Sequence, residues 1–178
     1  QMVTLPSNMF TSVTLPATLW FFDKAKRNKD EILFIDARNI FTQISRAQRK
    51  FSDEQIKNLG IITRLYEGKT EEYEALLHEY RDQLDVAPKS YWQDNLDWLT
   101  ERFPDGKYVD VVGLCKAAKL DGEDGIKDQD YSLNPGRYVG VVIEDDGMTE
   151  DEFRAEMLDL NVALTCLNAE AHELEARI

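Results

Sequence analysis

The stretch that decides the fold is Glu31-Ile32-Leu33-Phe34-Ile35-Asp36, an almost continuous apolar run. Such a run is typical of a strand that is buried on both faces of a sheet. A second run of this kind, Thr18-Leu19-Trp20-Phe21-Phe22, lies upstream, and Met2-Val3-Thr4-Leu5 comes before it and stops at Pro6. The polar, basic segment 23–30 separates the two longer runs, which predicts a hairpin with a long loop. Each run is short enough to be a buried helical segment instead.

After residue 40 the apolar residues recur at the period of a helix. Ser52-Asp53-Glu54-Gln55 and Ser90-Tyr91-Trp92-Gln93 have the pattern of a capping box, and Gly68, Pro88 and Pro104 are suitable stops. The sequence therefore predicts three helices. Their apolar stripes are Ile56, Leu59, Ile62 and Tyr66; Tyr73, Leu76, Leu77, Tyr80 and Leu84; and Leu96, Leu99 and Phe103.

The last part of the chain predicts one long helix. Thr149-Glu150-Asp151-Glu152 is a further capping box, with Met148 and Phe153 placed as a hydrophobic staple. An unbroken heptad pattern follows, which spans about 39 Å at ~1.5 Å per residue. Its members are Phe153, Met157, Leu160, Leu164, Leu167, Ala171, Leu174 and Ile178. A weaker second stripe consists of Leu158, Val162, Cys166 and Ala169.

A helix that is apolar on two sides usually lies between two neighbours. The candidate partner-binding residues are therefore Phe153, Met157, Leu160, Leu164, Leu167, Leu174 and Ile178. The alternative is that this helix caps the core of its own domain.

The charge of the chain is distributed unevenly. The formal net charge is −13 over 178 residues, which argues against a lone binder of nucleic acid. Residues 1–60 carry a net +3, residues 61–143 a net −7 and residues 144–178 a net −9. A mildly basic head thus precedes an acidic body and a strongly acidic tail.

Eight cations lie close together in the basic head and are candidates to face phosphates. They are Lys24, Lys26, Arg27, Lys29, Arg38, Arg46, Arg49 and Lys50. An ordinary solvated surface explains the same residues, because clusters of lysine are common on soluble domains.

Catalytic, cofactor-binding and metal-binding residues are not recognisable in this sequence. It contains neither a phosphate-binding glycine loop nor a zinc spacing, and Glu74 with His78 fits a solvated helix pair. His172 is expected on the surface. The segment Asp121–Asp130 resembles a calcium loop in composition only, since Ile126 takes the place of its glycine.

Cys115 and Cys166 form no motif and are expected to be buried, reduced thiols, which predicts a cytoplasmic protein. No apolar run is long enough to span a membrane. The chain begins at Gln1 and enters β-prone residues at once, which we expect of a chain that was cut from a longer one.

The segment Asn134-Pro135-Gly136-Arg137-Tyr138-Val139 superficially resembles the Asn-Pro-Pro-aromatic tetrapeptide with which adenine methyltransferases hold the exocyclic amine. Gly136 stands in place of the second proline, and Arg137 in place of the aromatic residue. Proline followed by glycine predicts a type II turn instead. Arg137 or Tyr138 could still dock onto a neighbouring domain.

Six segments together resemble the M subunits of type I restriction–modification systems. They are Leu5–Phe10, Leu15–Phe21, Glu31–Arg38, Ser52–Ile56, Gly113–Ala118 and Tyr131–Gly140. The family consists of S-adenosylmethionine-dependent adenine-N6 DNA methyltransferases. The segment Leu65–Asp105 carries no motif of the family, so its role is open.

The resemblance implies an α/β fold: the C-terminal strands of a Rossmann-like methyltransferase sheet (residues 1–50), a helical and loop-rich region (51–147) and a long heptad helix for subunit assembly (148–178). It implies that the motifs for catalysis and for S-adenosylmethionine lie upstream of Gln1. The partners it implies are the rest of the M subunit, the specificity subunit, the restriction subunit and, in the assembled complex, DNA.

Two hypotheses follow. In the first, the chain is the C-terminal part of such an M subunit, is inactive alone and supplies assembly surface. In the second, it is a self-contained acidic adaptor that oligomerises through its last helix. An unpaired sheet edge is expected under the first hypothesis.

Overall fold

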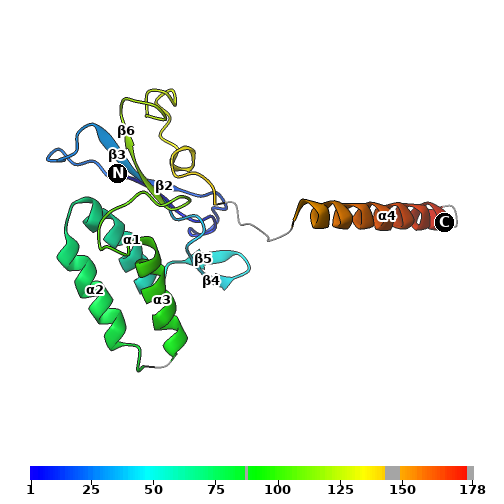
Figure 1. The fold of residues 1–178 in the computed structure, drawn as a ribbon, viewed down its shortest axis with the longest axis horizontal. Coiled ribbons are helices and arrows are strands. Elements are labelled where there is room, and N and C mark those ends of the chain that lie inside the picture. Colours follow the sequence, from blue (N-terminus) through cyan, green and yellow to red (C-terminus); the bar gives the residue numbers. More distant parts are fainter. Residues whose placement is uncertain (87, 143–148, 176–178) are drawn as a thin grey trace. The chain divides into compact units, whose positions relative to one another are not determined.

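The apolar run at residues 31–36 forms β3, an inner strand of a four-stranded sheet, in the computed structural model of the chain. The structure describes residues 1–86, 88–142 and 149–175. The strand order is β2-β1-β3-β6, with β1 parallel to β3 and both outer strands antiparallel to their neighbours (Figure 1). The bounds are β1 Met2–Thr4, β2 Thr18–Trp20, β3 Glu31–Asp36 and β6 Cys115–Lys119.

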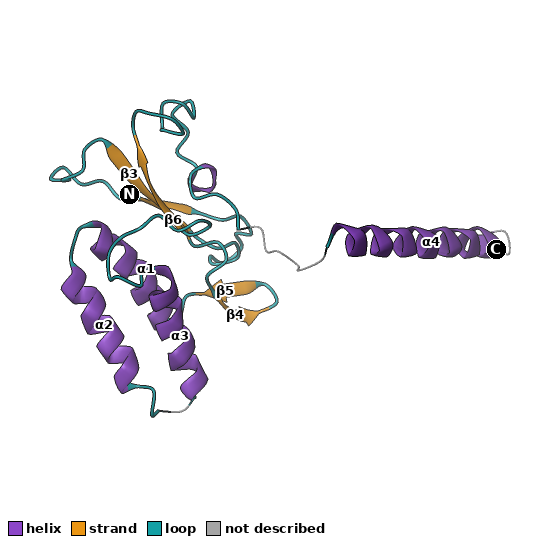
Figure 2. Ribbon diagram, viewed as in Figure 1, coloured by secondary structure: helices purple, strands orange, loops and turns teal. Residues whose placement is uncertain are grey.

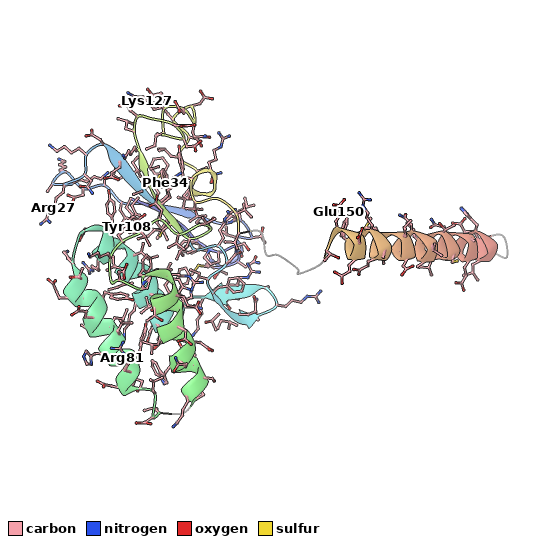
Figure 3. All side chains as sticks on the ribbon, viewed as in Figure 1. Arg27, Phe34, Arg81, Tyr108, Lys127 and Glu150 are labelled. Atoms are coloured by element: carbon pink, nitrogen blue, oxygen red, sulfur yellow. The ribbon has the colours of Figure 1, made fainter. Side chains whose placement is uncertain are left out.

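Strand β3 is buried on both faces, as the sequence predicts. Leu33 and Ile35 belong to the larger core cluster, which they share with residues of the helices. Phe34, labelled in Figure 3, belongs to the second cluster. Its ring stacks on that of Tyr138, with the centroids 4.2 Å apart and the planes 9° from parallel. The alternation follows because successive side chains of a strand point to opposite faces.

Three helices lie together on one side of the sheet (Figure 2). They are α1 (Asp53–Tyr66), α2 (Thr70–Asp82) and α3 (Lys89–Arg102). The capping box of α1 is confirmed: the Gln55 amide donates to Ser52 Oγ at 3.2 Å, and the Ser52 amide donates to Gln55 Oε1 at 2.9 Å. Gly68, with a φ of 79°, follows the end of this helix.

The segment Leu65–Asp105 forms most of this helical layer and supplies residues to its core. Four members of the predicted α2 stripe are buried: Tyr73, Leu76, Leu77 and Tyr80. Leu99 and Phe103 of the third stripe are fully buried in the same core. The helices and strands β1 and β3 therefore share one hydrophobic core.

The predicted hairpin of Thr18–Phe22 with Glu31–Asp36 is wrong. Strand β1 lies between β2 and β3 and pairs with both of them. The expectation that Thr18–Phe22 is buried on both faces is also wrong, because β2 is an edge strand whose three residues are all exposed. A short apolar run does not specify which strand will pair with it.

The predicted capping box at Ser90 is also wrong. Helix α3 already begins at Lys89, and the extended residue at its N-cap is Pro88. Ser90 therefore has helical backbone and cannot take the extended conformation that an N-cap residue needs.

The predicted type II turn at Asn134–Arg137 is replaced by a short 3₁₀ helix, η1 (Pro135–Arg137). A type II turn requires a positive φ at Gly136, and this residue does not have one. Instead, the Gly136 amide donates to Asn134 Oδ1 at 3.1 Å. Tyr138 is buried on Phe34, so it is not free to dock onto a neighbouring domain.

Two further features were not predicted. Strand β6 lies in the region 51–147, which was expected to be helical and loop-rich. Strands β4 (Thr42–Ser45) and β5 (Gln48–Lys50) form a separate two-stranded ribbon, which Figure 2 shows beside the helices.

The chain divides into two compact units, Gln1–Val142 and Ile143–Ile178. The second unit contains α4 (Glu150–Glu175), so the predicted long helix is confirmed. Met148 of the predicted staple lies outside the described residues.

Candidate assembly surfaces

Helix α4 begins at the predicted capping box. The Thr149 amide and hydroxyl both lie 2.8 Å from Glu152 Oε2, and the Glu152 amide donates to Thr149 Oγ1 at 3.3 Å. These hydrogen bonds to the ionised carboxylate lower the pKa of Glu152. Arg154 pairs with Glu150 at 2.6 Å on the first turns. The start of α4 is therefore determined by its own local sequence.

The predicted partner-binding residues of α4 are all exposed where the structure describes them. Their exposed fractions range from 44% at Met157 to 62% at Leu167. Phe153, Leu160, Leu164 and Leu174 lie between these values. Ile178 lies outside the described residues. Their role as a seam for a partner remains a prediction.

The second stripe of α4 is exposed as well, and this corrects one prediction. Cys166 is a free, exposed thiol, whereas it was expected to be buried. The expectation rested on the absence of a cysteine motif, and the side of α4 that carries Cys166 is exposed. Cys115 is free and buried, as expected, and burial raises the pKa of its thiol to about 11.

A second apolar surface, which we call the β2 edge, surrounds the edge strand in the first unit. Phe22 is 86% exposed. The other exposed apolar residues of this surface are Phe10, Val13, Leu15, Leu19, Trp20 and Phe21. The sequence predicted an unpaired edge but not these residues. Pro6 and Pro16, which flank β1 and β2, were the available signal, because proline is confined to edges and strand ends.

A groove of about 460 Å³ lies next to the β2 edge. Leu19 and Phe21 line one side of it, and Ile56, Gly60 and Arg64 of α1 line another. A Cβ atom at Gly60 would have no neighbour within 4 Å, so the helix backbone is open there. The groove is largely apolar and can accept side chains of another protein segment.

Metal-binding side chains are not gathered in the described ranges. Among these residues, no group of three or more His, Cys, Asp or Glu side chains could hold a metal ion. Glu74 and His78 are exposed on α2, and His172 Nδ1 lies 3.2 Å from Glu175 on α4. No helix in the described part of the chain is long and apolar enough to cross a membrane.

The amino-acid sequence of the chain is similar to those of known proteins. A family model described as N-6 DNA Methylase matches residues 1–146. The chain therefore belongs to the N-6 DNA methylase family.

Two relatives define the type of methylase to which it is similar. The methylase subunit of the type I restriction enzyme HindI from Haemophilus influenzae is 34% identical over 178 residues, covering 99% of this chain and 31% of that protein. The methylase subunit of the type I restriction enzyme MjaIX from Methanocaldococcus jannaschii is 31% identical, covering 99% of this chain and 25% of that protein. The chain thus spans less than a third of the length of either curated relative.

Proposed function

We propose that the chain is the C-terminal part of the methylase subunit of a type I restriction–modification enzyme. The whole subunit would methylate adenine at N6 in DNA with S-adenosylmethionine, in the cytoplasm of a prokaryote. One observation carries the proposal: the family model ends at residue 146, before α4, whereas the type I relatives match 99% of the chain. The segment that forms α4 is therefore matched by the type I relatives but not by the general methylase model.

The part proposed for this chain is assembly. The β2 edge would pair with a strand from the rest of the methylase subunit, so that β1, β2 and β3 complete a Rossmann-like sheet. An edge strand with unpaired backbone groups and exposed apolar side chains favours such pairing. No residue of this chain is proposed to bind S-adenosylmethionine or to carry out catalysis.

Helix α4 would pack against helices of the specificity subunit. Its apolar residues recur at the spacing of a coiled coil, and the acidic residues around them keep the unassembled helix soluble. The restriction subunit would join the same complex. The acidic tail also fits a chain that meets DNA only within the assembled enzyme, because a net −9 over residues 144–178 repels phosphates.

Co-purification of the complete methylase subunit with the specificity subunit tests this role. The variant Leu164→Asp with Leu167→Asp places two charges in the stripe and is expected to abolish association. The matched control, Asn161→Asp with Asn168→Asp, adds the same two charges to the same helix without removing an apolar side chain. It is expected to assemble normally.

The adaptor hypothesis makes a different prediction for the same variants. If the unmixed wild-type subunit is a homodimer by light scattering, and if Leu164→Asp with Leu167→Asp dissociates it, α4 is a self-association helix. Normal association of the stripe variant with the specificity subunit would contradict the assembly role.

A further inference from the structure

The ribbon of β4 and β5 is the part of the first unit where positive charge is least compensated by carboxylates. In the whole chain about one residue in five is acidic, with 34 Asp and Glu among 178 residues. Residues 37–52 contain none, although they contain Arg38, Arg46, Arg49 and Lys50. The ribbon, residues 42–50, carries three of these four cations.

The charged surroundings of this ribbon differ from those of the other basic segment, the loop 23–30. In the loop the four cations lie between Asp23 and Asp30, and Lys26 donates a hydrogen bond to the backbone oxygen of Glu31. A cavity of about 440 Å³ beside Arg27 is lined by both signs of charge, including Asp23 and Glu67. The loop, at whose end Figure 3 labels Arg27, therefore presents a mixed surface to a polyanion.

The side chains of Arg38 and Arg49 already have partners within the protein. Arg38 makes a bidentate pair with the buried carboxylate of Asp36, at 2.6 and 2.9 Å. The Arg49 guanidinium lies 4.0 Å from the centroid of the Phe41 ring, and its Nη1 donates to Ser7 Oγ at 2.9 Å. Both side chains therefore hold structure in place.

Arg46 and Lys50 remain available. Both are exposed, and neither forms an ion pair with any residue that the structure describes. Arg46 lies in the two-residue turn between the paired residues Ser45 and Gln48. The Gln43 side chain donates to the backbone oxygens of both of these residues and closes the turn.

The base of the ribbon is also fixed to the first unit by hydrogen bonds. The Arg49 amide donates to the backbone oxygen of Asn8 at 2.9 Å, next to the contact of its guanidinium with Ser7. The ribbon thus presents two cations, unpaired among the described residues, on a prearranged backbone, so the backbone loses little conformational entropy when they bind.

We propose that the β4–β5 ribbon contacts the sugar–phosphate backbone of duplex DNA through Arg46 and Lys50. The proposal rests on the proposed function, in which the assembled enzyme acts on DNA. A two-stranded ribbon fits the width of a DNA groove, and guanidinium and ammonium groups are the usual partners of phosphate. Since the contacts are to phosphate, they position the enzyme and carry no sequence preference.

The test is a salt titration of DNA binding by the complete methylase subunit assembled with its specificity subunit. Fluorescence anisotropy of a labelled duplex gives the association constant at each salt concentration. For Arg46→Ala with Lys50→Ala, the slope of log K against log salt is expected to flatten by about 1.8, at ~0.9 per phosphate contact. At 0.1 M salt this corresponds to a loss of roughly eightfold per cation, both on the recognition sequence and on unrelated DNA.

A matched control removes the same charge elsewhere: Lys24→Ala with Arg27→Ala in the loop 23–30 should leave the slope unchanged. The variant Arg46→Lys should keep the wild-type slope, because it keeps the charge. Equal flattening by the loop and ribbon variants would overturn the proposal, since the effect would then be that of net charge.

Two other outcomes also overturn it. If the ribbon variant loses the specificity subunit on size-exclusion chromatography while the loop variant keeps it, the ribbon binds an acidic protein surface instead. If the wild-type assembled enzyme does not bind DNA, the proposed function fails together with this inference. Binding by the wild type with an unchanged slope in the ribbon variant contradicts the ribbon alone.

Discussion

Helices α2 and α4 carry the same kind of apolar stripe, yet they have opposite environments. In α2 the stripe residues Tyr73, Leu76, Leu77 and Tyr80 are buried in the core of the first unit. In α4 the stripe is exposed along the described helix. The period of a stripe therefore predicts that a helix has a face to cover, but it does not predict what covers it. The difference separates a helix that stabilises its own unit from one proposed to bind a partner.

The largest expected effect comes from a matched pair of leucine truncations, which tests this comparison directly. Leu99 of α3 is fully buried in the core that it shares with α2, so Leu99→Ala should lower the free energy of unfolding by about 2–5 kcal/mol. Leu164 of α4 is 55% exposed, so Leu164→Ala should change it by less than about 0.5 kcal/mol. Urea unfolding followed by circular dichroism measures both. A large loss at Leu164 would mean that α4 packs on the first unit.

The two thiols give the next largest contrast. The pKa of Cys115 is raised from 9.0 to about 11 by burial, which lowers its thiolate fraction at neutral pH about a hundredfold below that of an ordinary thiol. Cys166 is exposed. Iodoacetamide should therefore label one thiol per native chain, and peptide mass spectrometry should place it at Cys166. Protection of Cys166 in the isolated chain would show that α4 is already covered.

A smaller effect is expected from the polar contact that joins the three helices. Asn58 is buried; its Nδ2 donates to Asn95 Oδ1 at 3.0 Å, and its Oδ1 accepts from the Tyr80 hydroxyl at 2.8 Å. Asn58→Ala leaves both partners without these bonds and should cost about 1–3 kcal/mol in chemical denaturation. Asn168→Ala on exposed α4 is the control and should have little effect. Equal stability of the two variants would show that the contact is dispensable.

The smallest expected effect concerns the start of α4. The pKa of Glu152 is lowered from 4.5, so its contribution to the cap is present above that value and is lost as the pH falls through the folded pKa. The NMR signal of the Thr149 amide should therefore shift over this acidic range. Glu152→Gln should abolish the shift, whereas Glu156→Gln, one turn later, should retain it. A shift that persists in Glu152→Gln would assign it to another carboxylate.

Features that depend on neighbouring residues were predicted well. The capping boxes at Ser52 and Thr149 formed because each hydroxyl needs only an amide three residues later. The burial of Glu31–Asp36 and the α2 stripe followed from the density and period of apolar residues. The prediction of a capping box at Ser90 was wrong because Pro88 and Ser90 are both signals for a helix start, and the helix began directly after Pro88.

Features that depend on distant residues were not predicted. Whether β2 pairs with β1 or with β3 depends on which strand reaches the sheet beside it, and a run of apolar residues is the same in either case. The pairing of β6 with β3 joins residues 80 or more positions apart. The 3₁₀ helix at Pro135 formed where the local dipeptide favoured a type II turn, next to the stacking of Tyr138 on Phe34.

The candidate surfaces divide in the same way. The stripe of α4 was found from the sequence because all of its described residues lie on one helix, and they need no partner to be recognised. The β2 edge and its groove were found only in the structure, since their residues come from separate strands and from α1. The eight basic residues of the head looked equivalent until the structure showed which ones have partners.

The sequence by itself determined where α1 and α4 begin, which residues form the stripes of α2 and α4, and the resemblance to type I methylase subunits. These properties reside in residues a few positions apart, where hydrogen bonding and side-chain period act directly. Only the tertiary structure decided that β2 is an edge, that Arg38 and Arg49 have partners within the protein, and that Arg46 and Lys50 form no ion pair with a described residue. Such outcomes depend on which distant groups meet once the chain has folded, because burial and charge pairing are properties of neighbours in space.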